Sequence, residues 1–155
     1  MLLHQSKTAI ANNSSNFFDE LLYLKSVIDS ANHQLKMMTT FDEKLGSLMN
    51  NIIALNNRNL QEIVQELFKI NANDRQLDNV VSVLYKHQDA FENILYLEKI
   101  IVNSYRKVIN HHQINFSICK KLQTQLNNVL YACLQVKLLR FNPNRIPQKN
   151  LGSLF

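Results

Sequence analysis

Helix-breaking residues are nearly absent from most of this chain. From Met1 to Asn142 the sequence holds one glycine, Gly46, and no proline, whereas Pro143 and Pro147 both come after that stretch. Proline costs a helix interior about 3 kcal/mol and glycine about 1 kcal/mol relative to alanine. The sequence therefore predicts an all-α fold, and its 155 residues are enough for one domain with a core of its own.

Apolar residues at heptad spacing predict which faces of the helices pack against other helices. Between residues 17 and 38 they follow one another at alternating intervals of four and three: Phe17, Leu21, Leu24, Ile28, Ala31, Leu35 and Met38. Such a narrow line, called the N-terminal seam below, is typical of a helix that packs against another helix. Residues 41–70 carry two apolar lines, so the helix there should contact at least two neighbours.

Capping patterns and polar clusters indicate where the helices begin and end. Thr40 and Glu43 have the spacing of a capping box, and residues 71–76 form a polar break typical of a turn. Heptad spacing from Leu77 to Ile109 then predicts a helix of about 50 Å. Residues 110–115 fit either a turn or a continuous helix, and a turn is favoured. A last helix should end before Pro143.

These signals together predict an elongated antiparallel bundle of three to four long helices with coiled-coil character. Residues 1–15 lack a sustained apolar pattern and end in an asparagine-serine cluster, so we expect a flexible leader there. The bundle should span residues 16–141. Residues 142–155 should form a flexible basic tail.

Charge is distributed unevenly along the chain, whose formal net charge is +5. Residues 1–98 hold eight bases and twelve acids, for a net charge of −4, whereas residues 99–155 hold nine bases and no acid. Lys120 and Lys121 could pair within the fold with two like-charged pairs, Glu62 with Glu66 and Asp74 with Asp78, or they could face an acidic partner. The sequence leaves both interpretations open.

Patterns typical of catalysis, metal binding or cofactor binding are missing from the sequence. No Glu-x-x-His or Cys-x-x-Cys motif occurs, and Cys119 and Cys133 lie about 21 Å apart along one predicted helix. An isolated Gly46 cannot build a phosphate-binding loop. We therefore expect a non-enzymatic protein without catalytic residues, metal, cofactor or small-molecule substrate, and with both thiols reduced.

The most economical interpretation is a protein–protein interaction subunit, scaffold or adaptor of a larger complex. Its partners would be other helical protein subunits, in a hetero- or homo-oligomer, inside the cell as a soluble cytoplasmic or nuclear protein. The residues expected to bind partners are Phe17, Leu21, Leu24, Ile28, Leu35, Lys120, Lys121, Lys137 and Arg140. Two alternatives stay open: a basic C-terminal half that contacts nucleic acid or an anionic membrane, and a helical pathogen-encoded effector.

Overall fold

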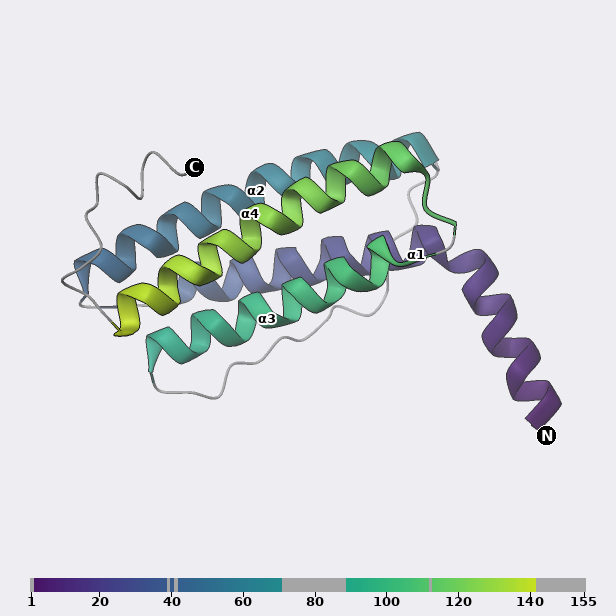
Figure 1. The fold of residues 1–155 in the computed structure, drawn as a ribbon, viewed down its shortest axis with the longest axis horizontal. Helices are drawn as coiled ribbons and strands as arrows, with labels where there is room; N and C mark the ends of the chain where they lie inside the picture. Colours follow the sequence, from purple (N-terminus) through teal and green to yellow (C-terminus); the bar gives the residue numbers. More distant parts are fainter. Residues whose placement is uncertain (1, 39, 41, 71–88, 112, 142–155) are drawn as a thin grey trace.

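Four long helices make up the protein in a computed structural model that describes residues 2–38, 40, 42–70, 89–111 and 113–141, with side chains from Phe17 onward. They are α1 (Leu2–Met37), α2 (Glu43–Ile70), α3 (Ala90–Ile109) and α4 (Phe116–Phe141). The helices pack side by side as an elongated bundle (Figure 1), which confirms the predicted fold class.

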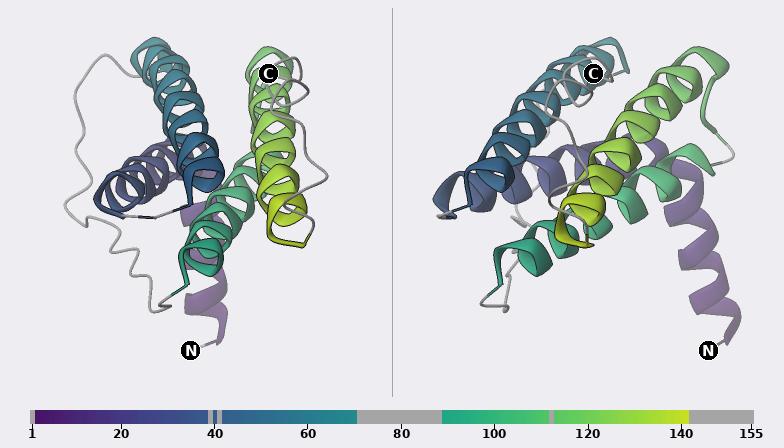
Figure 2. Two further views of the ribbon diagram at one scale, coloured as in Figure 1. Left: turned by 90° about the vertical axis from the view of Figure 1, so that its left-hand side faces the viewer. Right: turned by 60° about the vertical axis from the view of Figure 1, so that its left-hand side comes forward.

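Each helix packs against two others. α1 contacts α2 and α3, and α4 contacts the same two helices from the other side, so the four helices occupy the corners of a square (Figure 2). In Figure 1 the sequence colours show that α2 and α3 run in one direction and α1 and α4 in the other. These four contacting pairs are therefore antiparallel, while α2 ends and α3 begins at opposite ends of the bundle.

The N-cap of α2 lies two residues after the predicted one. Asp42 caps the helix, because its Oδ1 accepts hydrogen bonds from the backbone N–H groups of Lys44, at 3.0 Å, and Leu45, at 3.2 Å. Thr40 was the predicted cap, but its hydroxyl oxygen accepts from the N–H of Asp42 instead, at 3.2 Å. The carboxylate satisfies two unpaired donors of the first turn, which makes Asp42 the stronger cap.

The predicted uninterrupted helix from residue 77 to residue 109 is wrong. Asp89 has an extended backbone, with φ −82° and ψ 124°, and its carboxylate accepts from the N–H of Phe91 at 3.0 Å. α3 therefore begins at Ala90. Asp89 and Glu92 have capping-box spacing, a signal that the heptad pattern obscured. The predicted turn at 71–76 and the predicted helical stretch at 77–88 lie outside the described residues.

The favoured turn between residues 109 and 116 is confirmed. The N–H of His111 donates to the carbonyl of Val108 at 3.0 Å, and the side-chain oxygen of Asn115 caps α4 by accepting from the N–H of Ile118 at 2.8 Å. The turn reverses the chain, so α3 and α4 pack antiparallel. α4 ends at Phe141, the predicted end of the bundle.

The predicted boundary at residue 15 is not a helix start. α1 begins at Leu2, and its first turns project beyond the bundle (Figure 1). The asparagine-serine cluster at 12–16 therefore lies inside a helix and does not cap one. No proline or glycine in this stretch opposes helix, which explains the early start. The predicted tail at 142–155 lies outside the described residues.

Candidate functional site

The N-terminal seam forms part of the core. Leu21, Leu24, Ile28 and Leu35 are 0% exposed and Phe17 is 8% exposed. α2 and α3 of the same chain cover this side of α1, so its apolar line stabilises the chain's own fold. We therefore correct the expectation that these five residues bind a partner: the seam is not a partner surface in this fold.

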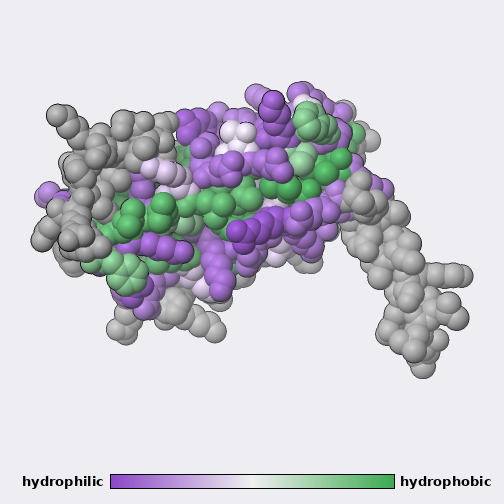
Figure 3. Space-filling view, in the orientation of Figure 1, coloured by the Kyte–Doolittle hydropathy of each residue, from purple (hydrophilic) through white to green (hydrophobic). Residues whose placement is uncertain are grey.

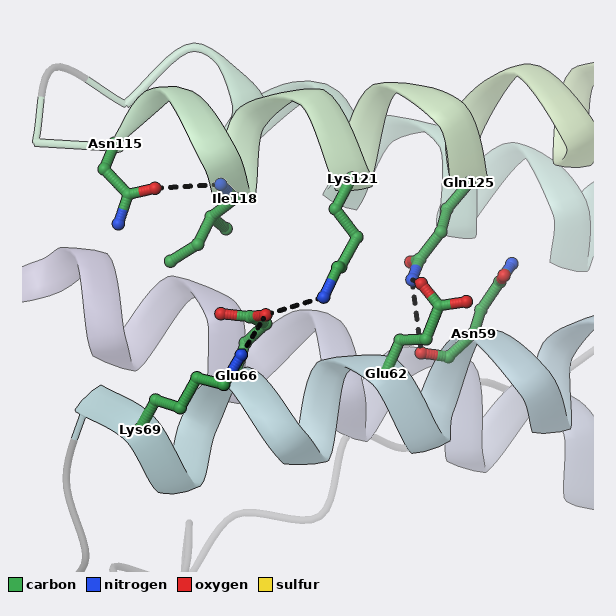
Figure 4. Close-up of polar contacts among 8 residues, drawn as sticks. All are labelled: Asn59, Glu62, Glu66, Lys69, Asn115, Ile118, Lys121 and Gln125. Carbon is green, nitrogen blue, oxygen red and sulfur yellow. Dashed lines mark hydrogen bonds and ion pairs between the residues drawn. The ribbon is translucent and has the colours of Figure 1, made fainter.

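Two of the predicted basic residues form ion pairs within the bundle. Lys121 on α4 reaches Glu66 on α2, with 2.7 Å between Nζ and Oε1, and Lys69 approaches the same oxygen at 3.3 Å (Figure 4). The Lys121 ammonium lowers the pKa of Glu66, and Glu66 in turn raises the pKa of Lys121. At the other end of α4, Arg140 Nη2 lies 3.2 Å from Glu92 and 3.6 Å from Asp89.

The other two basic residues of α4 face solvent. Lys120 and Lys137 are exposed, and neither forms an ion pair within the part of the chain that the structure describes. The helix carries no acidic residue. Its four bases therefore divide equally between internal ion pairs and solvent-exposed positive charge.

A polar groove of about 630 Å³ lies between α2 and α4. Gln125, one of its lining residues, donates from Nε2 to Glu62 at 3.2 Å and accepts from the Tyr105 hydroxyl at 2.8 Å. These bonds join three helices through one buried amide. The described residues contain no group of three histidine, cysteine or acidic side chains that could hold a metal ion.

The core contains a buried carboxyl group that solvent cannot reach. Glu98 on α3 is 0% exposed, and the Cys133 thiol on α4 donates to it with 3.7 Å between Sγ and Oε2. Burial raises the pKa of Glu98 to about 8. Burial and the neighbouring carboxyl also raise the pKa of the Cys133 thiol. An unreactive protonated thiol beside an enclosed acid does not form a catalytic centre.

A further feature of the described residues is an apolar line on the outer face of α4. It consists of four residues that we call the α4 stripe, with exposed fractions of 37%, 48%, 44% and 73%: Leu130, Leu134, Leu138 and Phe141. Intervals of four, four and three place them on one helix face. Figure 3 shows a hydrophobic band along this side of the molecule.

Sequence reasoning missed the α4 stripe although its signal was present. The buried apolar line of α4 includes Leu122, Val129 and Val136, which are 1%, 0% and 0% exposed. A second line at intervals of four residues runs beside it, as it does in residues 41–70. Two apolar lines on a helix indicate two packing surfaces, and the fold covers only the first.

The described helices include none that is long and apolar enough to cross a membrane. Comparisons of the chain with protein-family models, curated proteins and solved structures give no match.

Proposed function

We propose that this protein is a non-enzymatic interaction subunit that binds a helix of another protein through the α4 stripe. The observation that carries the proposal is the alignment of four large, exposed apolar side chains on one face of a helix. Single exposed apolar residues are ordinary on protein surfaces. A line of them at intervals of three and four is the pattern by which one helix recognises another.

The energetic reason for binding is the apolar area that stays in contact with water. Full burial of a leucine or phenylalanine side chain contributes about 1.5–3 kcal/mol. Each residue of the α4 stripe still has between 37% and 73% of its surface exposed, so a partner helix would gain a fraction of that value at every position. Leu134, near the middle of the line, should contribute most because neighbours on both sides exclude water from it.

Two further observations support an interaction role over the alternatives. The core already contains apolar residues of all four helices. The α4 stripe is therefore available to a partner without being needed for the core of the fold. Lys121 and Arg140 are held by acids of the same chain, which reduces the positive charge that nucleic acid would need.

The free thiols of Cys119 and Cys133 fit a reducing compartment.

The test is affinity capture from an extract of the organism that encodes the chain. A triple variant, Leu130→Ser, Leu134→Ser and Leu138→Ser, is compared with wild type. Phe68→Ser serves as the matched control, since Phe68 is 60% exposed but lies on α2. Circular dichroism and urea unfolding establish that all variants fold.

We expect wild type and the Phe68→Ser protein to recover the same partner and the triple variant to lose it. Recovery of an identical set of proteins by all three, or of none by wild type, would contradict the proposal.

A further inference from the structure

The charges around the α4 stripe indicate what kind of helix would bind there. We infer that the occupant is an amphipathic helix of another protein whose apolar line is flanked by acidic side chains. This inference rests on the proposed function, because it specifies the partner of the same surface.

The first step of the argument is the position of the two exposed lysines that form no described ion pair. Lys137 lies three residues after Leu134, and Lys120 lies fourteen residues before it, about four helical turns away. Both lysines are therefore near the face that carries the α4 stripe. They are about 25 Å apart along the helix axis, so a partner helix of about 17 residues could reach both of them.

The second step concerns the neighbouring helix. On α3, Lys99 and Arg106 are exposed and lie seven and fourteen residues after Glu92, which pairs with Arg140 on α4. Intervals of seven place both bases on the same face of α3 as Glu92. The acids of this face, Glu92 and Asp89, lie at the Phe141 end of the α4 stripe and pair with Arg140, and the bases follow farther along the helix. An acidic partner would gain favourable Coulomb interactions at its rim, where charges also control the rate of encounter.

A second copy of α4 does not meet this requirement. Residues 99–155 contain no acid, so the charged side chains that two copies of α4 bring to the interface would all be basic. Like charges across an interface oppose association. The chain's own C-terminal segment after Phe141 is unsuitable for the same reason, because it holds Arg145 and Lys149 but no acid.

An anionic membrane is a less suitable occupant than an acidic helix. Beside the Phe141 end of the α4 stripe, Arg140 is held by Asp89 and Glu92, whose side chains remain 44% and 43% exposed. A continuous anionic surface would be repelled by these carboxylates. A helix can place its acids beside Lys120 and Lys137 alone.

The experiment uses two synthetic 21-residue peptides with the same leucines at heptad positions a and d. One carries glutamate at positions e and g and the other carries lysine. Fluorescence anisotropy measures their binding to the full chain at 50 mM and 300 mM salt, and flotation measures binding to vesicles of phosphatidylserine and phosphatidylcholine. The protein variants are Leu134→Ser, Phe141→Ser and the double charge reversal of Lys120→Glu with Lys137→Glu.

We expect the glutamate peptide to bind at least tenfold more tightly than the lysine peptide at 50 mM salt, with a smaller difference at 300 mM. Leu134→Ser or Phe141→Ser should weaken binding of the glutamate peptide. The double charge reversal should abolish or invert the difference in affinity between the two peptides. Three outcomes would overturn the inference: equal affinity for both peptides, binding of neither, or binding to vesicles in place of the glutamate peptide. If both peptides bound equally well but still through Leu134, the inference about an acidic partner would be wrong and the proposed function would be retained. Failure of the affinity capture would contradict the proposed function itself.

Discussion

The Cys133 thiol on α4 donates a hydrogen bond to the carboxyl group of Glu98 on α3, with 3.7 Å between Sγ and Oε2. The other carboxyl oxygen, Oε1, is also buried and has no hydrogen-bond partner among the described residues. Burial raises the pKa of Glu98 to about 8, and this effect outweighs side-chain hydrogen bonding with Cys133 and Asn56, which acts to lower the pKa. The bundle therefore encloses a carboxylic acid that is mostly protonated at neutral pH.

This neutral acid makes the stability of the fold depend on pH. The pKa of Glu98 is about 8 in the fold and 4.5 for the unperturbed group, so between those values the unfolded chain releases a proton that the folded chain keeps. The free energy of unfolding should fall by about 1.4 kcal/mol for each pH unit across this window and level off above it. Urea unfolding at pH 5, 6, 7 and 8 measures the slope.

Glu98→Gln should flatten this dependence, because an amide does not ionise. Asp29→Asn on α1 is the matched control, since that side chain is exposed on the surface of the bundle. The lowered pKa of Glu66 acts in a different window, below about pH 4.5, where protonation removes its contribution. An unchanged slope in the Glu98→Gln protein would contradict the account of a buried neutral acid.

The ion pair of Lys121 with Glu66 should contribute measurably to stability. Lys121→Met leaves a carboxylate that is 6% exposed without its shortest contact, and we expect a loss of about 1–3 kcal/mol. Lys120→Met should change the free energy of unfolding by less than about 0.5 kcal/mol, because that side chain is exposed. Urea denaturation midpoints compare the two neighbouring lysines. Equal effects would argue against the internal pair.

Leucines of the N-terminal seam and of the α4 stripe should respond differently to truncation. Leu24 is 0% exposed and Leu134 is 48% exposed. Leu24→Ala should cost about 2–5 kcal/mol of unfolding free energy, and Leu134→Ala less than about 1 kcal/mol. Thermal unfolding at two protein concentrations distinguishes an internal seam from one shared between chains. A loss at Leu24 that shrinks with rising concentration would indicate the latter.

Gly46 offers a substitution that should stabilise the protein. A Cβ at this position in α2 would lie 3.6 Å from the Thr40 methyl group, which is ordinary van der Waals contact. Gly46→Ala should therefore raise the free energy of unfolding by up to about 1 kcal/mol through helix propensity and the smaller freedom of the unfolded chain. Differential scanning calorimetry measures the shift in Tm, and a lower Tm would mean that the helix needs glycine there.

Local sequence signals predicted the elements better than their connections. The scarcity of glycine and proline predicted helix, and heptad spacing predicted that the N-terminal seam packs against another helix, since both effects act within a few turns. It did not show that this helix belongs to the same chain. The break of α3 at Asp89 was missed because the apolar spacing continues from Leu84 to Phe91 across it. Periodicity reports which residues share a face and not where the backbone leaves the helix.

The candidate site was harder to predict because it depends on what the fold covers. Lys121 and Glu66 were recognised as possible partners, but only the packing of α2 against α4 brings the two side chains together. The complete burial of Glu98 beside Cys133 depends on how α3 and α4 pack. Leu134 was overlooked because a buried line runs beside it.

The α4 stripe is tested most directly by photocrosslinking in the cells that produce the protein. A benzophenone amino acid replaces Leu134 in one variant and Phe68 in another, both at exposed apolar positions, and crosslinked products are identified by mass spectrometry. We predict that position 134 crosslinks to a helical segment of another protein and that position 68 does not. Crosslinking of that same protein equally at both positions, or none at position 134, would contradict the assignment of α4 as the interaction surface.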